Sequence, residues 1–176
     1  KFPDNQKRMW AAYYAAITFM DEQVGRILSE LDTLGLRDST AVVFTSDHGY
    51  HLGDHTFWQK GNVHEQVTRV PLILDVPGKK PGRSQSIVEL VDLYPTYCEL
   101  LGIDIPTHVQ GNSLTGILSD PSASVKRGGL SFVSNKGSGW RTLHWAYLRY
   151  KDGAEELYDM RKDPDQLTNL ARSKDH

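Results

Sequence analysis

The sequence predicts an α/β fold with a small antiparallel β subdomain at its C-terminal end. Three observations lead to this prediction: an amphipathic helical pattern opens the chain, two short β-branched runs follow, and alternating aromatic residues mark the last third. The chain has 176 residues, of which 39% are hydrophobic and 24% are charged, so it can bury a real core. This composition argues against disorder.

Residues 5–34 are predicted to form one long helix with a single buried stripe. Apolar residues recur along this segment at the i, i+3, i+4 and i+7 positions, from Trp10 to Leu34. Asp4 suits the N-cap of this helix, and Gly35 suits the position just after its last turn.

Two runs, residues 41–45 and 70–74, are predicted to be buried strands. Both are continuously apolar and β-branched, which is typical of strands covered on both faces, as in a parallel sheet. A helix is expected over residues 92–101, because Pro95 is tolerated only in a first turn and Gly102 follows the last apolar residue. Residues 114–118 are expected to form one further helical turn.

A domain boundary is predicted at residues 120–124, where Asp, Pro and Ser cluster. Residues 1–120 would form the α/β part, and residues 121–176 a small β subdomain with a terminal helix. Within the latter, strands are expected in residues 130–133, 140–150 and 156–159, separated by turn signals at Gly137 and Asp152-Gly153.

The composition also excludes several classes of protein. Lys and Arg number 20 and Asp and Glu 22, a net charge of −2, which does not suggest nucleic-acid binding. No apolar run approaches the roughly 18 residues that a membrane span requires. The single cysteine, Cys98, rules out an internal disulfide and a Cys-rich zinc site. Its apolar neighbours predict a buried structural thiol, and no Gly-x-Ser-x-Gly elbow or phosphate-binding glycine loop is present.

The loop after the first predicted strand concentrates groups that bind metals. Asp47 and His48 follow the strand directly, at the sheet edge where α/β folds bind ligands. Carboxylates suit Ca²⁺ or Mg²⁺, and imidazole suits Zn²⁺ or Mn²⁺. Gly49 lets the backbone leave the strand tightly. A polar, solvated turn is the alternative interpretation, because two residues do not complete a coordination shell.

Four more polar residues of this region are candidates for the same site. Lys60 could neutralise an anionic substrate or stabilise a leaving oxygen, or it could be a surface lysine. His64 follows at the end of the loop. His51 and His55 could supplement the metal, line the pocket or face water.

A series of motifs spaced along nearly the whole chain carries a family resemblance. They lie at residues 13–28, Ser46-Asp47-His48-Gly49, Leu52-Gly53-Asp54-His55, Trp58, Lys60, residues 69–73, 88–96, 111–114 and 155–159, Asp163-Pro164 and Asn169-Leu170. Together they resemble the C-terminal portion of a type I sulfatase of the alkaline phosphatase superfamily. The Gly-Asp-His and Trp-x-Lys variants look most similar to the iduronate sulfatase branch.

The resemblance implies a three-layer, alkaline-phosphatase-like sheet and a specific chemistry. In this family a formylglycine, made from Cys or Ser in a Cys/Ser-x-Pro/Ala-x-Arg motif, attacks sulfur, and Ca²⁺ (or another divalent cation) binds the sulfate oxygens. Asp47 matches the metal-ligand aspartate, and His48 stands where other members place a second ligand. Lys60 matches the lysine that contacts the sulfate ester and steadies the departing alkoxide. His64 falls where members often place a residue of the catalytic pocket.

The family's nucleophile motif and its paired N-terminal aspartates are absent from this sequence. Cys98 is followed by Glu99-Leu100-Leu101-Gly102, which is not the modification motif. The chain is therefore expected to be a fragment, or a cleaved chain that works with the N-terminal portion of the same enzyme. Its substrate is expected to be a sulfate ester, on a sulfated sugar by resemblance, and its location the periplasm, the lysosome or the cell exterior.

Two other functions stay open. A hydrolase of phosphate esters or phosphonates in the same superfamily could carry the same Asp-His-Gly loop and downstream lysine. A non-catalytic glycan-binding fragment could line a sugar groove with its C-terminal aromatics, although their spacing also suits the packed face of a sheet. These aromatics are Trp140, Trp145, Tyr147 and Tyr150.

Overall fold

The computed structural model describes residues 2–173, with side chains from Asp4 onward. The chain divides into two compact units, each assembled from segments that are far apart in the sequence. Unit 1 comprises residues 2–46, 50–60 and 71–78, and unit 2 comprises residues 47–49, 61–70 and 79–173. Three short 3₁₀ turns, Arg37–Ser39, Asp54–Thr56 and Leu90–Asp92, punctuate the connections.

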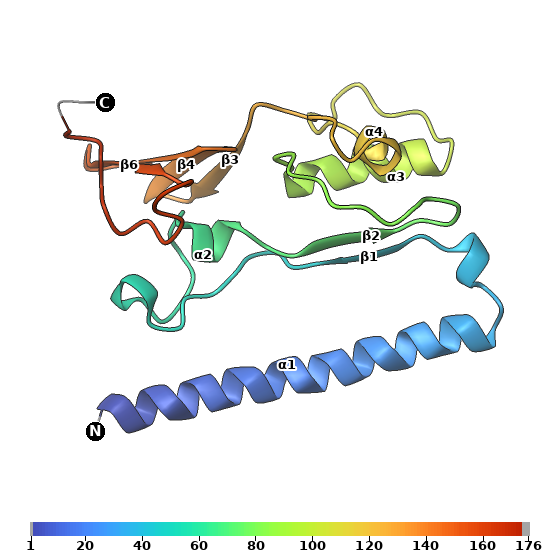
Figure 1. Cartoon of the computed structure of the whole chain (residues 1–176), viewed down its shortest axis with the longest axis horizontal. Helices are drawn as coiled ribbons and strands as arrows, with labels where there is room; N and C mark the ends of the chain where they lie inside the picture. The colour runs from blue at the N-terminus through green and yellow to red at the C-terminus, as the bar shows by residue number, and fades with distance from the viewer. Residues whose placement is uncertain (1, 174–176) are drawn as a thin grey trace. The chain divides into compact units, whose positions relative to one another are not determined.

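Unit 1 contains the long helix α1 (Phe2–Thr33) and the two-stranded sheet of β1 (Val42–Thr45) and β2 (Leu72–Asp75), visible in Figure 1. Gly35 ends the helix as predicted, with φ of 65° and with the Leu36 N–H donating to the Leu31 carbonyl at 3.0 Å.

The two strands of unit 1 correct the expected parallel arrangement, because β1 and β2 pair antiparallel. A parallel pair needs a crossover of a dozen or more residues, usually helical. The connection between these strands carries only the four-residue helix α2 (Glu65–Thr68), so the chain returns in the opposite direction. Thr45 faces Leu72 and Val42 faces Asp75 across this ladder.

The prediction that the first helix has a buried apolar stripe is also wrong. No side chain of residues 4–33 is buried, and Ile27 is 68% exposed. Strand β2 likewise alternates half-buried and exposed residues instead of being covered on both faces. The apolar pattern that predicted burial is real, but the described residues of this chain do not cover it.

Unit 2 contains the short helices α2, α3 (Leu93–Leu100) and α4 (Thr115–Ser119) and a four-stranded sheet. The strands β3 (Gly128–Val133), β4 (Gly137–Thr142), β5 (Trp145–Tyr150) and β6 (Glu155–Asp159) follow one another as an antiparallel meander. This sheet confirms the antiparallel subdomain. Pro95 lies in the first turn of α3, and Cys98 is buried in the same helix, both as predicted.

The two faces of this sheet differ because side chains alternate along each strand. The inner face packs a core of Val63, Ala146, Leu148, Tyr158 and Met160, with Tyr150 against it. On the outer face, Trp140 stands directly opposite Tyr147 in the β4–β5 register. The four candidate groove aromatics therefore do not share one face, since Tyr150 joins the core.

The boundary predicted near residue 120 does not separate the two units. Lys126 reaches back across it, with its Nζ 2.6 Å from Asp92 Oδ1 and 2.7 Å from Glu89 Oε2. The Leu130 N–H also donates to Glu89 Oε1 at 2.7 Å. These contacts join residues 79–120 to the β subdomain.

The terminal helix is also corrected, because residues 160–173 form turns. The Asp163 carboxylate accepts hydrogen bonds from the Leu167 and Thr168 N–H groups, which holds this segment in a turn. None of the helices in the described part of the chain is long and apolar enough to cross a membrane.

Candidate functional site

Asp47 and His48 form a local pair two residues after β1. The Asp47 side chain is 82% exposed, and its Oδ2 lies 3.3 Å from His48 Nε2. The His48 N–H donates to Asp47 Oδ1 at 3.0 Å, and His48 Nδ1 lies 2.9 Å from the Gly49 carbonyl oxygen. The carboxylate and the imidazole thus present polar atoms to the same small region.

Gly49 fixes where this pair leaves the strand. Its N–H donates to the Val67 carbonyl at 2.8 Å, and a Cβ at position 49 would lie 2.0 Å from the Gln66 carbonyl oxygen. No residue with a side chain fits so close an approach. The tight exit predicted for Gly49 is therefore a backbone-to-backbone contact with the segment of α2.

The donor set of this pair fits part of a divalent-cation site. A carboxylate and an imidazole within 3.3 Å can serve one ion, and the exposed carboxylate suits a hard cation such as Ca²⁺. Within residues 2–173, however, no group of three or more His, Cys, Asp or Glu side chains gathers in metal-binding geometry. A cation held here would need further ligands, such as those that the sulfatase resemblance places upstream.

His51 and His55 belong to unit 1 and contact each other. His51 is fully buried, and its ring stands edge-on to His55 at 6.0 Å and 5.4 Å from Phe57. Helix α1 supports the start of this segment, because Trp10 Nε1 donates to the Leu52 carbonyl at 2.8 Å. His51 is therefore a packed residue of the loop, and its proposed place in a pocket wall stays a prediction.

Lys60 is exposed and lies in unit 1, whereas Asp47, His48 and His64 belong to unit 2. The next residue, Gly61, begins a segment of unit 2 and accepts a hydrogen bond from Lys136 Nζ at 3.3 Å. The role expected for Lys60 at a sulfate ester stays a prediction.

His64 lies in a buried hydrogen-bonded cluster of unit 2. Its ring is nearly buried, and its Nε2 lies 3.1 Å from Glu156 Oε2. The Tyr158 hydroxyl donates to the same oxygen at 2.8 Å. Burial, with the nearby Glu156 carboxylate, raises the pKa of Tyr158, so this phenol stays protonated and keeps donating. This geometry suits a residue that positions the end of the loop, and a catalytic role for His64 stays a prediction.

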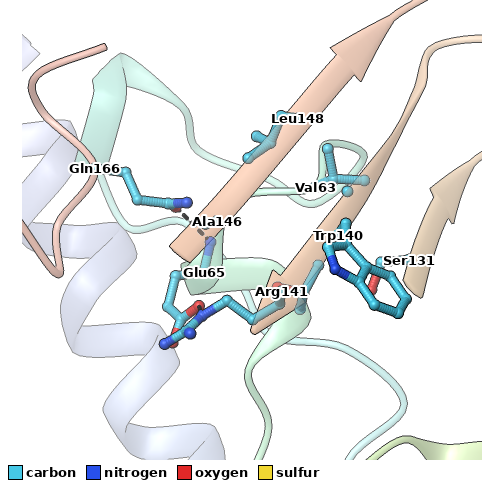
Figure 2. A pocket seen from close by; sticks show the side chains of 10 residues that line it. Val63, Glu65, Ser131, Trp140, Arg141, Ala146, Leu148 and Gln166 are labelled. Carbon is cyan, nitrogen blue, oxygen red and sulfur yellow. Dashed lines mark hydrogen bonds and ion pairs between the residues drawn. The ribbon is translucent and has the colours of Figure 1, made fainter. Parts of the chain in front are cut away.

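A second polar cluster, which the sequence did not reveal, surrounds Glu65. Arg141 Nε lies 2.9 Å from Glu65 Oε2, and the Glu65 N–H donates to Gln166 Oε1 at 2.7 Å. Figure 2 shows these side chains beside a small cavity whose volume is about 10 Å³. No local pattern could have found this cluster, because its three members lie far apart in the sequence.

Comparison with protein families gives two overlapping matches. The sulfatase family model matches residues 1–103, and the model for the C-terminal region of N-sulphoglucosamine sulphohydrolase matches residues 53–176. Arylsulfatase K of Mus musculus is 36% identical over 188 aligned positions, which cover 97% of this chain and 34% of the relative. The chain thus spans about a third of the length of this relative.

Solved structures show the same fold. BT4656, in complex with its substrate D-glucosamine-2-N,6-O-disulfate, superposes with a TM-score of 0.81 at 30% identity, covering 88% of this chain and 34% of that one. The phosphonate monoester hydrolase of Silicibacter pomeroyi gives a TM-score of 0.78 at 28% identity, covering 89% and 35%.

The α/β fold predicted from the sequence is therefore the fold of these hydrolases. Because the two family models together match the chain from end to end, and the first alone matches more than half of it, this chain belongs to the sulfatase family.

Proposed function

We propose that this chain supplies part of the active site of an enzyme that hydrolyses sulfate esters of a sulfated carbohydrate. The observation that carries the proposal is the Asp47–His48 pair, whose side chains converge within 3.3 Å in a sulfatase-family chain. The nucleophile, a formylglycine, would come from the N-terminal portion of the same enzyme.

In this proposal Asp47 and His48 hold a divalent cation, Ca²⁺ by resemblance, together with ligands outside this chain. When bound, the ion would offset the negative charge of the sulfate oxygens. The chain's own contribution is orientation: Gly49 presses the loop against α2, and the His48 N–H fixes one oxygen of the Asp47 carboxylate.

Lys60 is proposed to stabilise the leaving oxygen of the ester. This oxygen gains negative charge as the S–O bond breaks, and an ammonium group offsets that charge at the moment it develops. What supports the role is the place of Lys60 in the segment 46–60, which resembles the corresponding sulfatase segment.

The proposed substrate is a sulfated sugar, because BT4656 acts on a sulfated glucosamine. A closer relation to iduronate sulfatases is a finer prediction from the Gly-Asp-His and Trp-x-Lys variants. Hydrolysis of phosphonate monoesters is the second candidate, favoured by the similarity to the Silicibacter enzyme.

The test compares the complete enzyme with its Lys60→Ala variant on an aryl sulfate and an aryl phosphonate monoester. We expect turnover of the sulfate to fall by about a hundredfold or more, since one such electrostatic contact contributes about 3 to 4 kcal/mol to the barrier. Lys80→Ala, an exposed lysine of unit 2, is the matched control and should leave the rate unchanged. A preference of the wild type for the phosphonate would favour the second candidate, and a normal sulfate rate in Lys60→Ala would refute the role of Lys60.

A further inference from the structure

An open groove of about 470 Å³ lies at one end of the four-stranded sheet of unit 2. Its walls come from the β3–β4 turn and from the last residues of β5. The residues that the argument uses are Phe132, Lys136, Ser138, Arg149 and Lys151.

The groove is positively charged. Lys136, Arg149 and Lys151 line it, and none of its lining residues carries a carboxylate. Two acids lie next to the lining. Glu155 stands opposite Arg149 in the β5–β6 register and accepts the Tyr147 hydroxyl, and Asp152 accepts the Ala154 N–H at 3.0 Å. The three lining cations still outnumber these two acids, and this excess of positive charge attracts an anionic ligand.

The strand register arranges a cation beside an apolar ring. Phe132 faces Ser138 across β3–β4, and Ser138 faces Arg149 across β4–β5, so the three side chains stand in one row on the outer face. Phe132 is 73% exposed. An exposed ring, a hydroxyl and a guanidinium in a row suit a sugar that carries a sulfate or a carboxylate, because the guanidinium fork matches both anions.

The β3–β4 turn beside the groove contacts the segment that follows Lys60. Asn135 takes a left-handed conformation with φ of 58°, and the Lys136 N–H donates to the Val133 carbonyl at 2.9 Å. This tight turn directs Lys136 Nζ to the carbonyl oxygen of Gly61, at 3.3 Å. Gly61 directly follows Lys60, the residue proposed to contact the scissile ester.

We infer that this groove binds a second anionic group of the glycan, a sulfate or a carboxylate on a sugar neighbouring the one that is hydrolysed. The inference rests on the proposed function and narrows it to substrates with more than one negative charge. Arg149 and Lys151 are the main contacts, while Lys136 joins the groove to the segment after Lys60.

The experiment measures the complete enzyme, its Arg149→Gln/Lys151→Gln variant and a Lys162→Gln control. Lys162 follows Asp159, which pairs with Trp145 at the opposite end of the sheet from the Arg149–Glu155 pair. The probes are a heparin-derived tetrasaccharide, which carries several anionic groups, and an aryl monosulfate, which carries one. Binding of the tetrasaccharide is measured by calorimetry at several NaCl concentrations, and KM and kcat are measured for both probes.

We expect the double variant to bind the tetrasaccharide at least tenfold more weakly and with a shallower salt dependence. Its loss in kcat/KM should be at least tenfold greater for the tetrasaccharide than for the monosulfate, and should appear mainly in KM. Lys162→Gln should match the wild type. Equal losses in kcat/KM for both probes, or unchanged binding of the tetrasaccharide, would overturn the inference that this groove binds an anionic group.

A failure of the proposed function gives a different result. In that case the wild type hydrolyses neither sulfate, whereas the calorimetric comparison of the three proteins still reports on the groove.

Discussion

Position 49 must be a glycine, because a side chain there would collide with the backbone of Gln66. The backbone of Gly49 touches that of Gln66 and Val67, and this contact sets where Asp47 and His48 lie. The sequence predicted that a glycine was needed here for a tight exit, but it could not show that the segment starting at Glu65 was the partner.

We expect Gly49→Ala to destabilise the protein by about 1–3 kcal/mol, because the added methyl group forces two backbone segments apart. Gly25→Ala is the matched control, since nothing lies within 4 Å of a Cβ at this position of α1. This control should be neutral or slightly stabilising, because alanine favours helix. Chemical denaturation checks both variants, and equal midpoints for Gly49→Ala and the wild type would contradict the close contact.

Asp159 gives a prediction for acid pH. Hydrogen bonds from the Arg161 side chain, 2.7 Å away, lower the pKa of Asp159 to about 2. The folded pKa is below the unfolded value of about 3.9, so the stabilisation is present above pH 4 and is lost as the pH falls from about 4 to about 2. Arg161→Gln should raise the pKa of Asp159 toward 3.9, as NMR titration of the carboxyl carbon would show. Exposed Arg172→Gln should leave the titration unchanged.

At the scale of elements, one lysine joins helix α3 to strand β3. Asp92 is fully buried before α3 and accepts hydrogen bonds from the Glu89 N–H, the Asn112 N–H and Lys126. Burial acts to lower the pKa of Lys126, but its hydrogen bonds to Asp92 and Glu89 more than offset this and raise the pKa. The lysine therefore stays charged when the protein folds.

Replacing this lysine by Lys126→Met should cost about 3–5 kcal/mol, because it leaves the buried Asp92 carboxylate without its cation. The exposed Lys80→Met serves as the control and should change stability by less than about 0.5 kcal/mol. Denaturation monitored at pH 7 measures both. The prediction fails if the two variants unfold at the same denaturant concentration.

The elements themselves could largely be predicted, while their partners could not. The helix at 2–33, the helix around Pro95 and the C-terminal strands follow from periodicity and from turn residues. The direction of β2 did not follow, since an apolar run looks alike in parallel and antiparallel pairs. The prediction that the first helix is buried failed for another reason. The apolar stripe of α1 indicates that a packing partner is needed, but it does not identify that partner.

At the scale of the whole molecule, the chain does not divide into two consecutive parts at residue 120, because unit 2 continues through this position. The core of the C-terminal sheet includes Val63, and Glu65 pairs with Arg141, so the segment 61–70 belongs to the same folding unit as the sheet. Such long-range contacts cannot be read from local sequence. For the same reason the sequence does not predict that His64, Glu156 and Tyr158 form one cluster.

A fragment of residues 121–176 should therefore not fold by itself, because it lacks Val63, Glu65 and Asp92. A fragment of residues 61–176 retains all of these contacts and should show native-like packing. Near-UV circular dichroism and the dispersion of NMR amide signals distinguish the two. A well-dispersed spectrum from the shorter fragment would restore the boundary at residue 120.

The ladder between β1 and β2 has a consequence for how chains of the sulfatase family can diversify. Thr45 and Leu72 stand side by side, so the stretch of chain between them departs and returns at one anchored spot. Residues 47–49 and 61–70 of this stretch are packed, but the Gly53 N–H donates to the Phe57 carbonyl at 2.9 Å and closes the turn between them, so this turn can change in length and chemistry without displacing the strands. A loop that is anchored at both ends in this way can vary in sequence and alter ligand recognition while the strand pair keeps its structure.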